Sequence, residues 1–350
     1  LMLSGGSANT PSLIVGHDAA ESAFLSFFVG NVSTTGAVVG ENADTIGRLT
    51  VDGQTQWANE FGLVVGDAGA GVLDLMEGTT TTTQQLVVAE SAGSEGDLLM
   101  MLDGTATGVV EQLMVTESTT LGMGGTATAM IQNANLNTGR TVIGDLAGSM
   151  GTVTLLESEN FSRWEFEEEL TVGRLGVGSI VASDQVVISA PAGTPTPVYI
   201  ARETGSVGTV SLQGSLSLLE TEGAAINVGL NGNGALVLEQ GAYLGTGFLS
   251  VGPFEDPDEG AQGDMLIEGT GEYPEDDVPQ ALVDQELSVG NFGIGKLTMN
   301  NAATLRCLDA TFGVASGGDA EITINESTLE ATERLTMGLS ETTEGETAIL

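Results

Sequence analysis

Along the chain, a four-residue unit of the form apolar–any–apolar–small recurs thirteen times, and its last two positions run from Val15-Gly16 to Met337-Gly338. The twelve intervals from Gly16 to Gly338 span 322 residues, about 27 each, and eleven of them lie between 23 and 29. Apolar and polar side chains that alternate with a period of two occupy opposite faces of a β-strand. The pattern therefore predicts short strands at a fixed interval, which is the signature of a repeat architecture.

The small residue that closes each unit predicts a corner, because a corner needs positive φ or close backbone approach, and glycine tolerates both. Four copies end in another small residue, at Ala89, Thr116, Ala201 and Ala315. The other nine predicted corners are Gly16, Gly40, Gly66, Gly144, Gly173, Gly229, Gly252, Gly290 and Gly338.

Two further segments complete each repeat. A Gly-x-apolar-x-apolar unit follows the corner, as at 47–51, 151–155 and 208–212, and a weaker apolar segment such as 241–244 precedes the next corner. Three short strands per coil predict an all-β fold, a right-handed parallel β-helix (solenoid) of about 13 coils, or rungs, of roughly 23–29 residues. Coils stacked at ~4.8 Å pair every backbone group with the coils above and below.

We expect residues 1–350 to form a single continuous β-solenoid. The sequence carries no polar or helical cap at either end, whereas an exposed solenoid edge needs one to avoid edge-to-edge association. This favours a window of a longer chain. The alternative is that coils of neighbouring copies stack end to end in a fibre.

The stretches 287–299 (LSVGNFGIGKLTM) and 226–238 (INVGLNGNGALVL) resemble the solenoid repeat of autotransporter passenger domains, and similar repeats occur in other secreted bacterial surface proteins. The resemblance covers nearly the whole chain. It implies export and a role as a stalk, adhesin or matrix component. The chain departs from the family pattern in its acidity and in one long insertion, so no ligand of the family is carried over to it.

Charge narrows the possible partners. The chain has 48 acidic residues against eight basic ones, a formal net charge of −40. Such a surface repels phosphate backbones and anionic membranes, which excludes nucleic-acid binding. No apolar run approaches the ~20 residues of a membrane span, so membrane insertion is not expected. Because this charge requires screening by salt or divalent cations, we expect a secreted, extracellular or cell-surface protein.

The strongest break in the rhythm is the insertion between Gly252 and Gly290. Residues 253–286 hold twelve acids and four of the eight prolines, and flexible loops with several carboxylates suit calcium. The spacing does not match an EF-hand, and the alternative is a solvated acidic loop that keeps surfaces apart. The predicted calcium ligands are Glu255, Asp256, Asp258, Glu259, Glu275, Asp276 and Asp277; no other cofactor is expected.

Five other features could be either functional or structural. The aromatics of 161–169, including Trp164, would form either a glycan-stacking patch or core filling, and the same holds for Trp57. We interpret His17 as a turn residue and Cys307, in an alternating apolar and polar setting, as a buried core thiol rather than a reactive one. The threonine run 79–83 is discounted as an ice-binding array, because corresponding positions elsewhere hold Glu, Leu and Gly.

These features predict a secreted structural or adhesive protein, a rigid acidic rod in an extracellular filament, stalk or cell-surface layer, with itself or glycans as partners. The alternative is a polysaccharide-binding or polysaccharide-degrading β-helix. An enzyme is disfavoured because such enzymes gather carboxylates with Arg or Lys in one groove. Here the eight basic residues are scattered singly.

Overall fold

A computed structural model describes residues 2–18, 22–28, 30–101, 111–156, 161–252, 261–269, 278–314 and 318–338. Over these residues the regular structure is all β, and parallel strands form the stacked coils of a β-solenoid of about 12 turns. This confirms the predicted fold class. The chain divides into two compact units, Leu1–Glu168 and Glu169–Leu350, which are described separately. One continuous solenoid over residues 1–350 therefore stays a prediction.

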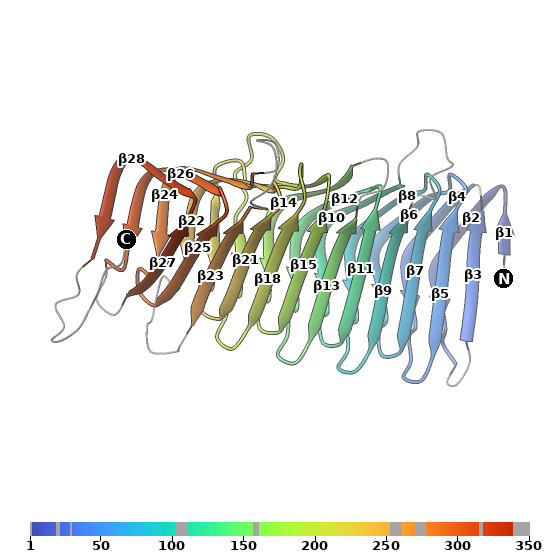
Figure 1. Ribbon diagram of the computed structural model, residues 1–350. Coiled ribbons are helices and arrows are strands. Elements are labelled where there is room, and N and C mark those ends of the chain that lie inside the picture. Colours follow the sequence, from blue (N-terminus) through green and yellow to red (C-terminus); the bar gives the residue numbers. More distant parts are fainter. Residues whose placement is uncertain are drawn as a thin grey trace. The chain divides into compact units, whose positions relative to one another are not determined.

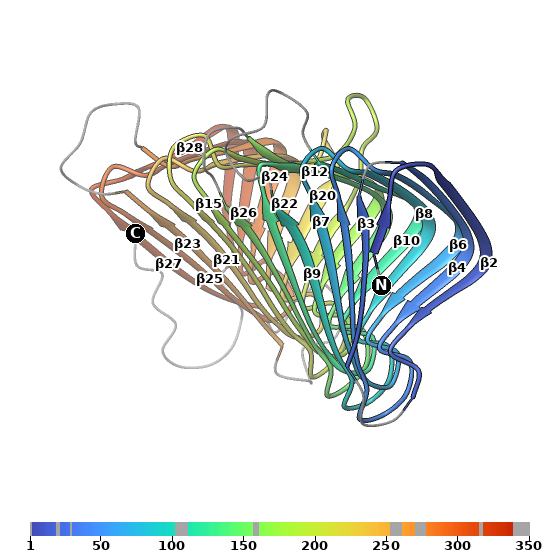
Figure 2. The same cartoon turned by 90° about the vertical axis from the view of Figure 1, so that its right-hand side faces the viewer.

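In the first unit each coil consists of one odd-numbered and one even-numbered strand, on opposite sides of the coil (Figure 1, blue to green; Figure 2). The odd-numbered strands are β1 (Met2–Ser4), β3 (Ser22–Phe28), β5 (Ile46–Asp52), β7 (Ala70–Met76), β9 (Glu95–Met101), β11 (Thr126–Gln132) and β13 (Met150–Leu156). The even-numbered strands are β2 (Ser7–Val15), β4 (Asn31–Val39), β6 (Gln56–Val65), β8 (Thr80–Val88), β10 (Glu111–Leu121), β12 (Ala134–Ile143) and β14 (Ser162–Val172), the last of which crosses the division.

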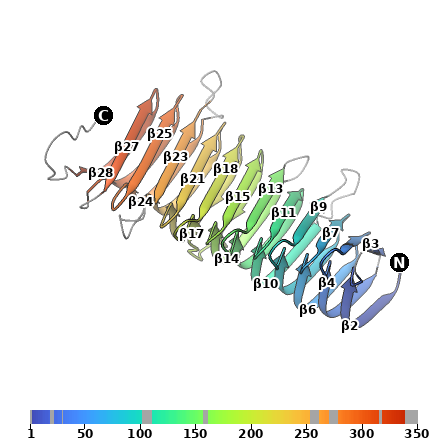
Figure 3. The same cartoon turned by 90° about the horizontal axis from the view of Figure 1, so that it is seen from below.

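The coils of the second unit also have strands on two faces. Figure 3 shows the strands of one face, which we call the first face, side by side. The first face consists of β15 (Val177–Ser183), β18 (Val207–Gln213), β21 (Asn233–Glu239), β23 (Gln262–Glu268), β25 (Ile294–Asn300) and β27 (Asp319–Asn325). The remaining strands are β16 (Val186–Ser189), β17 (Val198–Ile200), β19 (Leu218–Glu220), β20 (Ala225–Val228), β22 (Tyr243–Val251), β24 (Gln280–Val289), β26 (Thr304–Phe312) and β28 (Thr328–Met337).

The number of strands per coil differs from the prediction in most coils. The weaker apolar segment and the four-residue unit that follows it were predicted as two strands, but in most coils they form one long strand. This strand bends where its register shifts, for example between Val115 and Ser118 of β10. Such a shift is a β-bulge, which bends a strand without ending it. In the second unit the pairs β16/β17 and β19/β20 keep the predicted break, so those coils have three strands.

The core consists of columns of like residues. Leu49 of β5 lies in register with Leu73 of β7, which in turn lies in register with Leu98 of β9, and all three side chains are buried. Burying one such side chain stabilises the fold by roughly 1.5–3 kcal/mol. Each coil thus repeats the same contribution, as expected for a fold that grows along one axis.

The corner after each even-numbered strand joins successive coils. The amide of Gly40 donates to the carbonyl of Val15 at 2.7 Å, and the amide of Gly66 donates to Val39 at 2.7 Å. Gly71, on the strand of the next coil, packs directly against this corner. A Cβ at Gly71 would lie 2.3 Å from both the Gly66 nitrogen and the Val39 oxygen. The corner therefore needs glycine twice, once for conformation and once for space.

The thirteen predicted corners have four outcomes, and Ala89 and Ala201 are among those with positive φ, both at 59°. Eight of the nine glycines have positive φ, from 61° at Gly290 to 101° at Gly252. Gly338 does not, but a Cβ there would lie 2.0 Å from the Gly313 oxygen. Thr116 was misassigned: it lies in the bulge of β10, between Val115 and Ser118, and the corner is Gly122. Ala315 lies outside the described residues, and the corner of its coil is Gly313.

We predict that Gly71→Ala lowers the free energy of unfolding by about 3 kcal/mol, because the new methyl group meets backbone atoms that cannot move aside. Gly62→Ala in β6 is the matched control. No heavy atom lies within 4 Å of its added Cβ, so its effect should stay within about 0.5 kcal/mol. Urea denaturation of the two variants measures the difference, and equal midpoints would contradict the role of the close approach.

Candidate interaction surfaces

All seven predicted calcium ligands fall within residues 253–260 and 271–277, outside the described residues. In the described part of the chain, no group of three or more His, Cys, Asp or Glu side chains is arranged to hold a metal ion. Calcium binding by the acidic insertion therefore stays a prediction.

The two tryptophans fill the core. Trp164 and Phe166 of β14 are fully buried, and the Trp164 indole N–H donates to the Thr138 hydroxyl at 3.1 Å. Trp57 is 1% exposed and donates to the Thr34 hydroxyl at 3.0 Å. A buried indole normally finds such a partner for its N–H group. For these three rings the interpretation as core filling is confirmed and a glycan-stacking patch is wrong, whereas Phe161, the other aromatic of 161–169, is exposed.

A buried polar ladder crosses the core of the first unit beside Trp57. The Thr34 hydroxyl donates to the Asn59 side-chain oxygen at 2.7 Å, and the Asn59 amide donates to the Thr83 hydroxyl at 3.0 Å. This ladder of Thr34, Asn59 and Thr83 was not predicted from the sequence. The signal was available in the threonine run 79–83, whose alternate members are buried rather than displayed, as a strand period of two requires.

Glu111, at the start of β10, is a buried carboxylic acid with a structural task. At the corresponding corner of an earlier coil, the Gln54 amide donates to the backbone carbonyl of Glu77 at 3.0 Å. One coil later the Gly78 amide donates instead to the Glu111 carboxylate at 2.9 Å. Burial raises the pKa of Glu111 above its ordinary value. A side chain thus supplies the acceptor here in place of a backbone carbonyl.

Acidic residues of the first unit gather in the turns after the corners. Glu41, Asp67 and Glu90 follow corners of successive coils. The backbone amide of each donates to the carbonyl of the corner residue one coil earlier, at 2.9–3.0 Å. Burial and the neighbouring Asp67 raise the pKa of Glu90. His17 lies in the first of these turns, as predicted, and its imidazole pairs with Glu41, which raises the pKa of His17.

The outer face of the even-numbered strands is different, because it carries two columns of uncharged side chains. We name them the neutral columns. The first consists of Ser7, Asn31, Gln56, Thr80, Gln112 and Asn135, and the second of Asn9, Ser33, Ala58, Thr82, Met114 and Asn137. None of these twelve side chains ionises, in a chain whose net charge is −40. In the second unit, the same face carries Arg306 in register with Glu330.

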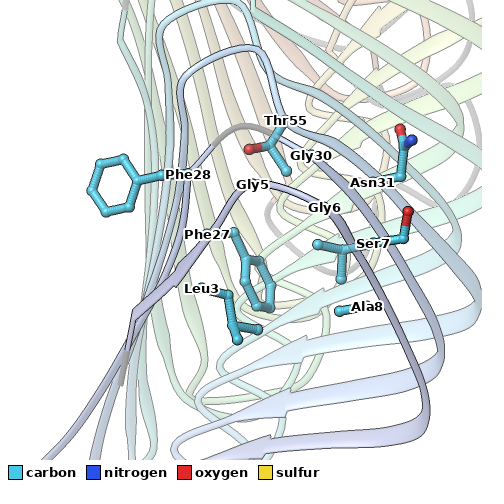
Figure 4. Close-up of a pocket in the computed structure, with 11 residues that line it drawn as sticks. Leu3, Gly5, Gly6, Ser7, Ala8, Phe27, Phe28, Gly30, Asn31 and Thr55 are labelled. Carbon is cyan, nitrogen blue, oxygen red and sulfur yellow. The ribbon is translucent and has the colours of Figure 1, made fainter.

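A shallow groove of about 550 Å³ runs over the neutral columns. It crosses β2, β4, β6 and β8, and eight of the neutral-column residues line it, from Ser7 to Thr82. A smaller pocket of about 60 Å³ lies in the first coil. There Leu3 and Phe27 lie inside the coil, while Phe28 points to the other side of its strand (Figure 4). Of these two hollows, the groove is the one with hydrogen-bonding side chains on an outer face.

One group in the second unit bears on acid–base chemistry. Burial, together with the charges of Glu222 and Asp284, raises the pKa of Glu220. Burial and the charges of Glu220 and Asp284 also raise the pKa of Tyr243. A carboxyl group with raised pKa beside a second carboxylate has the electrostatics of a general acid. Neither of the two hollows described above includes these residues.

Cys307 lies in β26 and is 3% exposed, which confirms the interpretation as a core thiol. Burial and the nearby Asp309 raise the pKa of the thiol to about 11. The thiolate, which is the nucleophilic form, is therefore scarce at neutral pH.

Comparisons with known proteins add no relative: no family model, curated protein or solved structure matches the chain. The described residues contain no helix long and apolar enough to cross a membrane.

The raised pKa of Glu111 predicts a specific pH dependence. Because ionisation costs more in the folded state, stability from this group is full below the unfolded pKa of about 4.5 and is lost as pH rises through the folded value. Glu111→Gln keeps an oxygen for the Gly78 amide and cannot ionise. We expect it to equal or exceed the wild type in stability at pH 7, with a difference that grows as pH rises from 4.

Glu111→Ala is the matched comparison. It leaves the buried Gly78 amide without its acceptor, so it should cost about 1–3 kcal/mol near pH 4, and less as rising pH reduces the contribution of Glu111 to the wild type. Thermal melts of both variants from pH 4 to pH 8 measure the effects. A Glu111→Gln protein that is less stable than the wild type across this range would contradict the assignment.

Cys307 should react with a soluble disulfide reagent about two orders of magnitude more slowly in the native protein than in denaturant, because its pKa is about 11 and its side chain is buried. Absorbance at pH 8 follows the reaction. Equal rates in both conditions would contradict burial.

Proposed function

We propose that this protein is a secreted structural or adhesive β-solenoid of an extracellular filament, stalk or cell-surface layer. The observation that carries the proposal is the column organisation of its outer surface. Turn acids such as Glu41, Asp67 and Glu90 repeat from coil to coil, and so do the neutral columns. A surface that repeats at strand spacing suits contacts with other repeating structures, such as matrix polymers or further copies of the chain.

The charge supports an extracellular setting. Stacked turn acids repel one another, and a net charge of −40 destabilises a compact state unless ions screen it. At physiological ionic strength the Debye length is about 8 Å, longer than the ~4.8 Å between coils, so simple salt only partly screens neighbouring turns. Divalent cations would screen them better, which is why calcium binding by the 253–286 insertion belongs to the proposal.

The likeness of segments 226–238 and 287–299 to autotransporter passenger repeats supports the same role. Polysaccharide degradation is the second candidate, and the raised pKa of Glu220 beside Asp284 is the observation that favours it. We rank it lower because the groove lies elsewhere, on the neutral columns.

The proposal predicts that antibodies against the purified protein label intact cells of the source organism. Immunogold electron microscopy of intact and permeabilised cells compares the outer surface with the interior, and a known cytoplasmic protein serves as the control. Gold confined to the interior would overturn the proposal.

Electron microscopy of native material before and after chelation then separates the forms of the proposal. Filaments with a spacing near ~4.8 Å that fray under chelation would assign calcium to their assembly. Discrete particles unchanged by chelation would favour a stalk or adhesin and contradict the filament.

A further inference from the structure

We propose that the groove over the neutral columns binds a neutral polysaccharide. The inference rests on the proposed adhesive role and names its ligand class and site. It stands on three observations: the groove itself, the absence of ionisable side chains from the twelve neutral-column positions, and the hydrogen-bonding capacity that its side chains leave unused.

The charge around the groove favours an uncharged ligand. A ligand at the groove meets no ionic partner among the neutral columns, but it does meet the field of a chain at −40. That field disfavours uronic acids, sulfated sugars, phosphates and nucleic acids. It would concentrate cations, but a cationic ligand gains little from a surface of amides and hydroxyls. An uncharged ligand pays neither cost.

The side chains of the groove can form hydrogen bonds with a ligand. Asn31 and Gln56 each offer a donor and an acceptor, and Thr80 adds a hydroxyl that does both. Within the described residues, these three side chains make no hydrogen bond to another protein group, although β-pairing places them in one column. Stacked amides often bond to one another along such a ladder. Here they remain available, and sugar hydroxyls need donors and acceptors side by side.

The groove suits a polysaccharide better than a protein partner. Protein partners usually require a buried apolar or aromatic anchor at the centre of an interface. The groove offers only the methyl group of Ala58 as an apolar outward side chain. It does offer the same pair of positions on four successive strands. A polymer whose hydroxyl groups recur along its length meets equivalent groups at each coil.

The test uses the full chain, made in a bacterial host so that Asn31, which stands in a glycosylation sequon Asn31-Val32-Ser33, stays unmodified. Its probes are neutral hexasaccharides of glucose, xylose and mannose, with hexagalacturonate and a sulfated dextran as charged counterparts. A glycan array selects the best probe, and titration calorimetry measures its affinity. We expect at least one neutral hexasaccharide to bind, and both charged probes to bind at least tenfold more weakly.

Gln56→Glu is the diagnostic variant, because it adds a charge to the groove with little change of shape. It should weaken the selected neutral hexasaccharide about tenfold, the worth of one or two hydrogen bonds. Gln280→Glu is the matched control, since Gln280 is the exposed first residue of β24 and gives the same net charge. It should leave affinity unchanged. Ala58→Phe, which fills the groove, should abolish binding while circular dichroism and thermal melts stay those of the wild type.

Several results would overturn the inference: no binding of any neutral hexasaccharide, preference for a charged probe, or equal losses in Gln56→Glu and Gln280→Glu. A change of sedimentation coefficient in the groove variants without glycan would instead make the face an interface between copies. Immunogold labelling separates this inference from the proposed function. Surface labelling without glycan binding would overturn only this inference. Glycan binding by a protein that is labelled only inside the cell would overturn only the cell-surface role.

Discussion

The hydrogen bond between a corner amide and the carbonyl one coil earlier is the constraint on which the rest of the structure depends. It holds Gly40 on Val15 at 2.7 Å, and Gly71 then packs against the next corner with no room for a side chain. This close approach fixes where each coil sits on the one before. Register follows from it, and register decides that Leu49 lies on Leu73 and forms a core column.

Register also governs the surface. In a globular domain a side chain has neighbours from many parts of the sequence, but in a solenoid it faces the same position of adjacent coils. Substitutions therefore accumulate by column. Turn acids such as Asp67 and Glu90 lie over one another despite the repulsion between them, and burial together with the charge of Asp67 raises the pKa of Glu90. Amides such as Asn31 and Gln56 share a different column. The first unit thus carries charged turns and, in the neutral columns, two uncharged rows on one face.

Most of the fold was predictable because its main determinant is local. Glycine marks most corners, and a period of two marks each strand, so the repeat is visible without any long-range knowledge. The bulges were not predictable in the same way. In β10 the consecutive outward residues Thr116 and Glu117 break the alternation, so Val115 resembled the end of a strand that continues to Leu121. The neutral columns required the correct register, because residues about 25 apart become neighbours only after the bulges are placed.

The separation of charge from the groove has a physical consequence of its own. Ion pairs between exposed side chains contribute little because water and salt screen them, so a charged groove would bind charged ligands weakly in a saline medium and would depend on ionic strength. Hydrogen bonds between neutral groups hardly respond to salt. For the proposed uncharged ligand, a face built from Gln56, Thr80 and their neighbours would therefore keep its affinity where the acidic turns are screened. The field of the acids would repel anionic polymers, and the neutral columns would still be able to hold an uncharged one.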